Sequence, residues 1–217
     1  LDSRIANYQM AARMQVEATE ALDVSHETEA TRKLYGVGEK ETDNFGRRCL
    51  MARRLVERGV RFVQIYPKGQ MWDNHTNLKT SLPAACKQSD LPTAALLRDL
   101  RQRGLLDDVL ILWGGEFGRT VYFQGRMTND DYGRDHHPRC YSLWMAGGGV
   151  QGGVVYGETD EFSYNIVKNP VHIRDFQATI LHLLGLDPFN FSYRYQGLDQ
   201  RLIGPEDTPK IVDGILA

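Results

Sequence analysis

The chain alternates between segments with a helical spacing of apolar residues and segments with a strand-like run. Apolar side chains recur every three or four positions between residues 42 and 58, which predicts a helix with one buried face. That face consists of Phe45, Cys49, Ala52 and Val56. We expect Thr42 to cap this helix and Gly59 to end it. The β-branched and aromatic run at 60–66 then predicts a strand.

The same order recurs later in the chain. A second helix is predicted at about 91–103, and the continuous apolar run 109–113 follows it. Such a run is typical of a strand that is covered on both faces, as in a parallel sheet. A short strand at 142–146 and a helix at 176–184, capped by Asp175, complete the pattern. The repeated order of helix and strand predicts an α/β sandwich with a mostly parallel sheet.

Two polar segments lie outside these elements. Residues 1–38 are polar and rich in alanine with a weak helical pattern, so we expect one or two helices there. We therefore divide the chain into a helical N-terminal segment, 1–40, and an α/β domain, 41–217. The stretch 120–140 predicts a long polar loop, and long loops inside a compact domain are usually functional or disordered.

Composition narrows the class of protein. The 217 residues are 41% hydrophobic and 25% charged, as in globular proteins. The formal net charge of −2 shows no basic excess, so we expect no nucleic-acid partner. No apolar run is long enough to cross a bilayer, so we expect no membrane partner. The arginines between residues 47 and 58 are expected on the solvated face of their helix, and the three widely spaced cysteines are expected to be small buried side chains.

Chemistry-bearing side chains gather in three clusters that follow predicted strands or lie in long loops. These are Asp73 with His75, Glu116 with Arg119, and Asp135 with His136 and His137. Ligands in α/β sheets gather beyond the carboxyl ends of the strands, and carboxylate oxygens with imidazole nitrogens are ligands for zinc, manganese or iron. Two such metals can clamp the attacking and leaving oxygens of a phosphoryl-type transfer. Arg119 can hold an anionic group in a bidentate fork.

Each cluster also has a plainer interpretation. An isolated Asp-x-His motif is more often a polar pair than a metal site, and His136 with His137 is equally consistent with a loop anchor. The three glycines at 147–149 do not match a nucleotide-binding loop and predict a tight turn after a strand. Since neither a Gly-x-Ser-x-Gly elbow nor a cysteine–histidine signature occurs, the sequence identifies no nucleophile.

Several runs together resemble the family known as domain of unknown function 1501. They are Trp72–Asn77, Gly104–Val109, Gly115–Thr120, Gly133–Pro138, Ala146–Val150 and Val155–Asp160. The resemblance extends from about residue 40 to the C-terminus. The family is placed with the alkaline-phosphatase and sulfatase superfamily, which implies a three-layer, alkaline-phosphatase-like α/β sandwich. It also implies hydrolysis of a small-molecule or glycan ester of phosphate or sulfate with a divalent metal, namely zinc, manganese or calcium.

The superfamily resemblance also implies roles for particular residues. Glu116 occupies the position of a metal-ligand aspartate, whereas Phe117 occupies the position of a ligand histidine, which is a departure. Asp73 and His75 resemble the Asp…His pair of the other metal site, although their spacing is shorter. One histidine of the pair 136–137 resembles the third ligand of that site.

Two functional hypotheses remain open. The first is the hydrolase, with Arg119 binding the substrate and with metal ligands drawn from Asp73, His75, Glu116, Asp135, His136 and His137. The second is a catalytically degenerate binding or scaffold module, which Phe117 favours. The resemblance places the nucleophile before Leu1, so we expect little ester hydrolysis by this chain alone. It also implies export, although the first residues lack the pattern of a signal peptide.

Overall fold

A computed structural model describes residues 2–205 and 209–217. The chain forms two compact units. The first consists of residues 1–102 and 128–132, and the second consists of residues 103–127 and 133–217. The boundary between domains that the sequence suggests near residue 40 stays a prediction.

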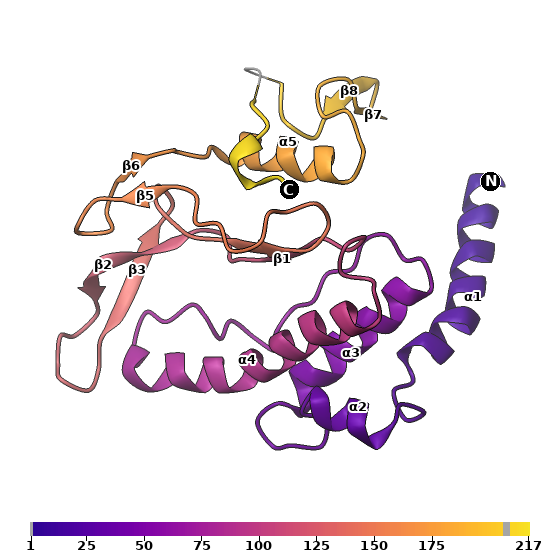
Figure 1. Cartoon of the computed structure of the whole chain (residues 1–217), viewed down its shortest axis with the longest axis horizontal. Helices are drawn as coiled ribbons and strands as arrows, with labels where there is room; N and C mark the ends of the chain where they lie inside the picture. Colours follow the sequence, from indigo (N-terminus) through magenta and orange to yellow (C-terminus); the bar gives the residue numbers. More distant parts are fainter. Residues whose placement is uncertain (1, 206–208) are drawn as a thin grey trace. The chain divides into compact units, whose positions relative to one another are not determined.

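The first unit is helical (Figure 1). Its helices are α1 (Asp2–Leu22), α2 (Glu29–Leu34), α3 (Asp43–Glu57) and α4 (Leu78–Gln102). α3 packs against α4, α1 packs against α3, and α2 packs against α4. The helices predicted within residues 1–38 and at 42–58 are therefore confirmed.

The start of α3 differs from the predicted cap. The Thr42 hydroxyl donates to the Gly36 carbonyl at 2.7 Å instead of accepting an N–H of the first turn. This hydrogen bond fastens the segment between α2 and α3 to the beginning of α3. On the predicted apolar face, Cys49 and Ala52 are buried and the other two residues are half-buried.

α4 is longer than the sequence pattern predicts, because it begins at Leu78 rather than near residue 91. Pro83 and Pro92 lie inside it, and each removes a backbone N–H from the helical ladder. The helix continues through both because it buries a face along much of its length, Pro92 included, while it packs against α3.

Charged side chains form part of the core of the first unit. Arg53 on α3 is 2% exposed. It makes ion pairs with Glu27 at 2.7 Å, with Glu57 at 2.6 Å and with Asp99 at 3.1 Å. Arg54, also buried, pairs with Glu27. The prediction of a solvated arginine face is therefore wrong for these two residues, because carboxylates from other segments accompany them into the core.

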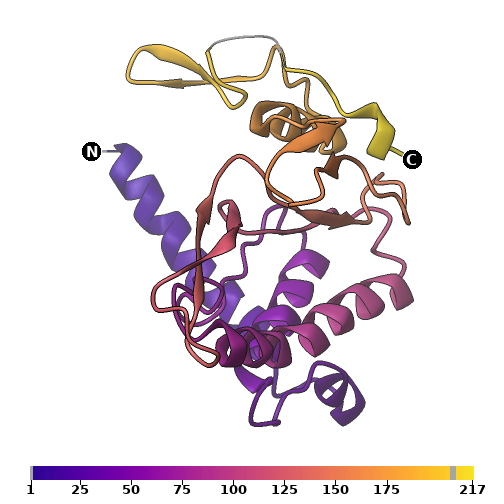
Figure 2. The ribbon, with the colours of Figure 1, turned by 90° about the vertical axis from the view of Figure 1, so that its left-hand side faces the viewer.

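The second unit is built from short strands and a helix. Among the described residues, its strands form four antiparallel pairs: β1 (Ile111–Trp113) with β4 (Trp144–Ala146), β2 (Gly118–Gln124) with β3 (Gly133–His137), β5 (Glu158–Thr159) with β6 (Ile166–Lys168), and β7 (Ser192–Tyr195) with β8 (Leu198–Arg201). Helix α5 (Ile173–Leu183) and the short 3₁₀ helix η1 (Asp213–Ile215) complete the unit. Figure 2 shows α5 beside the C-terminal segment of the chain.

The predicted three-layer sandwich with a mostly parallel sheet is wrong. Every sheet in the described part of the chain has two antiparallel strands. The strand predicted at 60–66 does not form. β1 pairs with β4 in antiparallel orientation, and Leu112 lies opposite Met145. Leu112 and Trp113 stay 45% and 36% exposed, so the run is not covered on both faces. The reason is that an apolar run favours a strand but does not select its partner.

The predicted long loop at 120–140 is also wrong, because most of it forms the β2–β3 hairpin. Gly118 lies opposite His137 and Gln124 lies opposite Gly133, with a register shift between these pairs. The polar sequence of β3 concealed the strand, since ladder hydrogen bonds rather than an alternating apolar pattern define it. The strand predicted at 142–146 is confirmed as β4.

α5 begins at Ile173, before the predicted start, and its cap is His172 rather than Asp175. The His172 Nδ1 accepts the Arg174 N–H at 3.2 Å. In return, the Asp175 carboxylate accepts the His172 N–H at 3.2 Å. The two side chains therefore form a capping box, with Asp175 at the third position of the helix.

A small apolar core forms around α5. It contains Ala178, Leu181 and Ile203, with Phe189 packed against it. The Thr179 hydroxyl, fully buried, accepts the Val212 N–H at 3.0 Å and so ties the C-terminal segment to α5.

The predicted glycine turn after β4 is confirmed. Gly147 has a φ of +74°, and a Cβ there would lie 2.3 Å from the Leu106 carbonyl oxygen. The next two glycines also have positive φ, which residues with a side chain rarely adopt.

Candidate metal-binding site

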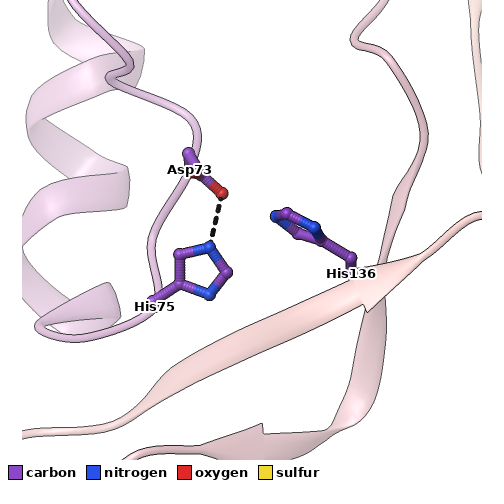
Figure 3. Close-up of side chains that lie close together, drawn as sticks. All are labelled: Asp73, His75 and His136. Atoms are coloured by element: carbon purple, nitrogen blue, oxygen red, sulfur yellow. Dashed lines mark ion pairs between the residues drawn. The ribbon is translucent and has the colours of Figure 1, made fainter.

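A loop between residues 70 and 77 presents Asp73 and His75 directly before α4. The His75 Nε2 and the Asp73 Oδ1 lie 2.9 Å apart (Figure 3). Both side chains are partly buried, with exposed fractions of 36% for His75 and 28% for Asp73. The Asp73 N–H donates to the Gln70 carbonyl at 3.1 Å, and the His75 N–H donates to the Asp73 carbonyl at 3.3 Å. The pair therefore has a defined geometry within the first unit.

The separation of these two atoms suits a shared ion. Two atoms that each bind one metal at about 2.0–2.2 Å lie about 3.0–3.5 Å from each other. The Asp73 oxygen and the His75 nitrogen therefore need only a small adjustment to bind the same ion. A carboxylate with an imidazole suits zinc or manganese, whereas calcium prefers ligands that are all oxygen.

The turn at 128–132 fastens the end of this loop. Asn77 has a left-handed φ of +53° and donates its N–H to the Asp131 Oδ1 at 3.0 Å. The Leu78 N–H donates to the Tyr132 carbonyl at 2.9 Å. Two backbone donors at the start of α4 thus have acceptors outside the helix. Sequence reasoning missed these contacts because their partners are far apart along the chain and have no joint local pattern.

The candidates of the second unit lie on the β2–β3 hairpin and in the turn before it. The Glu116 Oε1 lies 3.1 Å from an Arg119 nitrogen, and the Glu116 side chain is 58% exposed. The Phe117 ring lies 5.8 Å from the Arg119 guanidinium carbon and contacts the His136 ring edge-on, with centroids 4.8 Å apart. Phe117 therefore makes aromatic and cation–π contacts at the position where the resemblance implies a ligand histidine.

The two adjacent histidines of β3 have different surroundings. His137 is 4% exposed, and its Nε2 lies 2.8 Å from the Tyr164 carbonyl oxygen. Its ring also stacks on the Tyr164 ring, with centroids 4.7 Å apart. His136 is exposed, as expected for neighbouring residues that point to opposite faces of a strand. These contacts make His137 an anchor for the Tyr164 segment and favour His136 as the candidate ligand.

Asp135 forms hydrogen bonds with neighbouring segments of the hairpin. Its Oδ1 accepts the His136 N–H at 2.7 Å, and its own N–H donates to the Thr120 hydroxyl at 3.1 Å. The structure thus brings Asp73 to His75 in the first unit, and Phe117 into contact with His136 in the second. The convergence of both sets on one cleft stays a prediction.

The first unit contains another pair of the same chemistry. The Asp23 Oδ2 and the His26 Nε2 lie 3.3 Å apart, with exposed fractions of 44% and 78%. Because this pair is far more exposed than Asp73 with His75, it offers an internal comparison for any ligand-binding measurement.

Comparison with known proteins identifies the family of the chain. A family model described as "Protein of unknown function (DUF1501)" matches residues 1–216. No curated protein and no solved structure matches the chain. No helix among the described residues is both long and apolar enough to cross a membrane.

Proposed function

We propose that this chain, which belongs to the DUF1501 family of proteins of unknown function, is a metal-dependent hydrolase of phosphate or sulfate esters. Asp73 and His75 are the proposed metal ligands. The observation that carries the proposal is the 2.9 Å approach of their ligand atoms in a loop that backbone hydrogen bonds hold. Zinc or manganese suits this donor set better than calcium.

The proposed chemistry divides between the ion and the side chains. A bound divalent ion would polarise an ester oxygen and stabilise the charge that develops there. As ligands, Asp73 would contribute one negative charge and His75 none, so a divalent ion held by them would retain a net positive charge for the ester oxygen. An arginine presents five N–H donors, so the contact of Arg119 with Glu116 is compatible with a role in binding the anionic ester.

The alternative proposal is a degenerate binding or scaffold member of the family. Its support is Phe117, whose apolar ring packs against Arg119 and His136 at the position where the superfamily resemblance implies a ligand histidine. The two proposals differ in one measurable property, because the first requires a metal ion bound through Asp73 and His75.

The decisive experiment is a metal titration, because we assign no nucleophile to the chain. The purified protein is titrated with Co²⁺, whose visible absorption reports coordination, and then with Zn²⁺ and Mn²⁺ in competition. We expect Asp73→Ala and His75→Ala each to weaken Co²⁺ binding at least about tenfold. The matched control is His26→Ala, which removes the imidazole of the exposed Asp23 pair and should leave the affinity unchanged. If the wild-type protein binds no ion, or binds it equally well after both substitutions, the proposal is wrong.

The same titration tests the predicted third ligand. His136→Ala should weaken binding and change the Co²⁺ spectrum if His136 supplies a ligand. His137→Ala should instead loosen the Tyr164 segment, because it removes the stacked ring and the hydrogen bond to the Tyr164 carbonyl. An unchanged spectrum in His136→Ala would confine the site to the first unit.

A further inference from the structure

The loop that carries Asp73 and His75 ends at an unusual residue. Asn77 has a φ of +53°, a left-handed conformation that Asn and Asp adopt more readily than other residues with a Cβ. Its carbonyl accepts the Ser81 N–H at 2.9 Å and the Thr80 N–H at 3.1 Å, so it forms the first turn of α4. The backbone conformation of Asn77 therefore sets the direction in which the preceding loop enters α4.

The acceptor for the Asn77 N–H is a carboxylate from a distant part of the sequence. The Asp131 Oδ1 accepts this N–H at 3.0 Å. A carboxylate at a helix N-terminus is also favoured by the helix dipole. This hydrogen bond holds the left-handed residue that stands two positions after His75.

Hydrogen bonds within the turn hold the segment that carries Asp131. The Asp131 N–H donates to the Thr128 hydroxyl at 2.8 Å, and the Thr128 N–H donates to the Asp131 carbonyl at 3.2 Å. The neighbouring Asp130 pairs with the Lys79 ammonium at 2.9 Å, and both of these side chains are mostly exposed. Asp131 is thus held in place, whereas Asp130 makes only a solvent-exposed ion pair.

We infer that Asp131 is a positioning residue for the proposed metal site. Its carboxylate holds Asn77 and thereby the loop that brings Asp73 to His75. The inference rests on the proposed function, because it assigns to Asp131 an effect on metal affinity rather than on folding alone. Supporting residues of metal ligands are expected to matter in this way, since ligands must be oriented before the ion binds.

The test compares three variants of the turn in the Co²⁺ titration. Asp131→Ala removes the acceptor and should weaken Co²⁺ binding about tenfold, at the lower end of the effects of supporting residues. Asp131→Asn keeps an acceptor oxygen and should restore most of the affinity. Asp130→Ala removes the exposed carboxylate next to it and should leave the affinity unchanged. The Co²⁺ spectrum at saturation should shift in Asp131→Ala alone, because the geometry of the ligands changes.

A purely structural role has a different outcome. If Asp131→Ala lowers the unfolding temperature but the folded protein binds Co²⁺ with wild-type affinity and spectrum, the inference is overturned while the proposed site stands. If Asp131→Ala does not fold, Thr128→Ala replaces it, since this change loosens the turn and keeps the carboxylate. A wild-type affinity in Thr128→Ala then overturns the inference, and a weakened affinity supports it. If Asp73→Ala and His75→Ala both bind Co²⁺ with wild-type affinity, the proposed site and the inference are both overturned.

Discussion

The cores of the two units differ in chemistry. In the first unit, Arg53 lies 2% exposed among three carboxylates, and Tyr35 donates a hydrogen bond to Asp99 at 2.9 Å. In the second unit, the core around α5 is small and apolar, and many large apolar side chains remain on the surface. Tyr193, at 64% exposed, is one of them. The first unit buries paired charges beside aliphatic side chains such as Leu50 and Leu100, whereas the core around α5 in the second unit consists of a few aliphatic groups.

This difference determines how each unit responds to substitution. Removal of one partner from a buried ion pair strongly destabilises the fold, because the remaining charge stays buried without a counter-charge. An apolar core loses stability in proportion to the groups deleted and to the cavity that is left. The following predictions test whether the two units respond separately, in order of decreasing effect.

The largest effect is expected for Arg53→Ala. The change leaves Glu27 and Asp99 without the guanidinium that pairs with both, and should lower the free energy of unfolding of the first unit by about 3–5 kcal/mol. Hydrogen exchange of the α3 and α4 amides measures this effect. The control is Arg47→Ala on the same helix, whose exposed pair with Asp43 should contribute less than about 0.5 kcal/mol. Equal effects of the two changes would contradict the charged-core interpretation.

Leu181→Ala should come next and should act on the second unit. Leu181 is 4% exposed and packs with Ala178 and Ile203, so its truncation should cost about 2–4 kcal/mol. Faster exchange should be confined to the amides of α5 and the C-terminal segment. Equal acceleration in α3 would show that the two cores unfold as one.

Tyr35→Phe should have a smaller effect on the first unit. Burial raises the pKa of Tyr35, so its hydroxyl stays protonated and donates to Asp99 throughout the neutral range. Removal of this donor should cost about 1–3 kcal/mol, because the buried carboxylate loses a hydrogen bond. Denaturant unfolding followed by exchange in α4 measures the change. A stabilised Tyr35→Phe protein would mean that Arg53 alone satisfies Asp99.

The smallest expected effect is a loss of stability of the first unit at acid pH. Burial opposes the charged form of Glu27, but the hydrogen bonds from Arg53 and Arg54 outweigh it and hold the Glu27 pKa below its usual value of 4.5. A lowered pKa in the folded state means that the stability from Glu27 is complete above about pH 4.5 and is lost as the pH falls through the folded pKa. Unfolding curves between pH 7 and pH 3 should therefore show a loss of stability in the first unit. Glu27→Gln should reduce this slope, and an unchanged slope would assign the acid response to other carboxylates.

The local pattern of the sequence determined several elements correctly. The apolar spacing at 42–58 predicted α3, the glycines at 147–149 predicted a turn, and the run at 142–146 predicted β4. These features depend on neighbouring residues in the chain, so a window of a few positions contains the relevant information. The resemblance of the motifs to the DUF1501 family was also confirmed.

The largest errors concern contacts between distant segments, whereas smaller ones, such as the cap of α5, are local. The run at 109–113 favours a strand, but only the folded chain selects β4 as its antiparallel partner. Arg53 resembles a surface residue until Glu27, Glu57 and Asp99 are brought to it. Charge burial and strand pairing are properties of two or more segments at once, and no local pattern reports them.

The candidate site shows the same division. The sequence by itself determined that Asp73 and His75 carry suitable ligand atoms two residues apart. Only the tertiary structure decided that these atoms approach to 2.9 Å, and that Asp131 holds the end of their loop through the Asn77 N–H. Ligand chemistry is a property of residue types, whereas ligand position depends on backbone hydrogen bonds between segments far apart in the chain, and these form only when the chain folds.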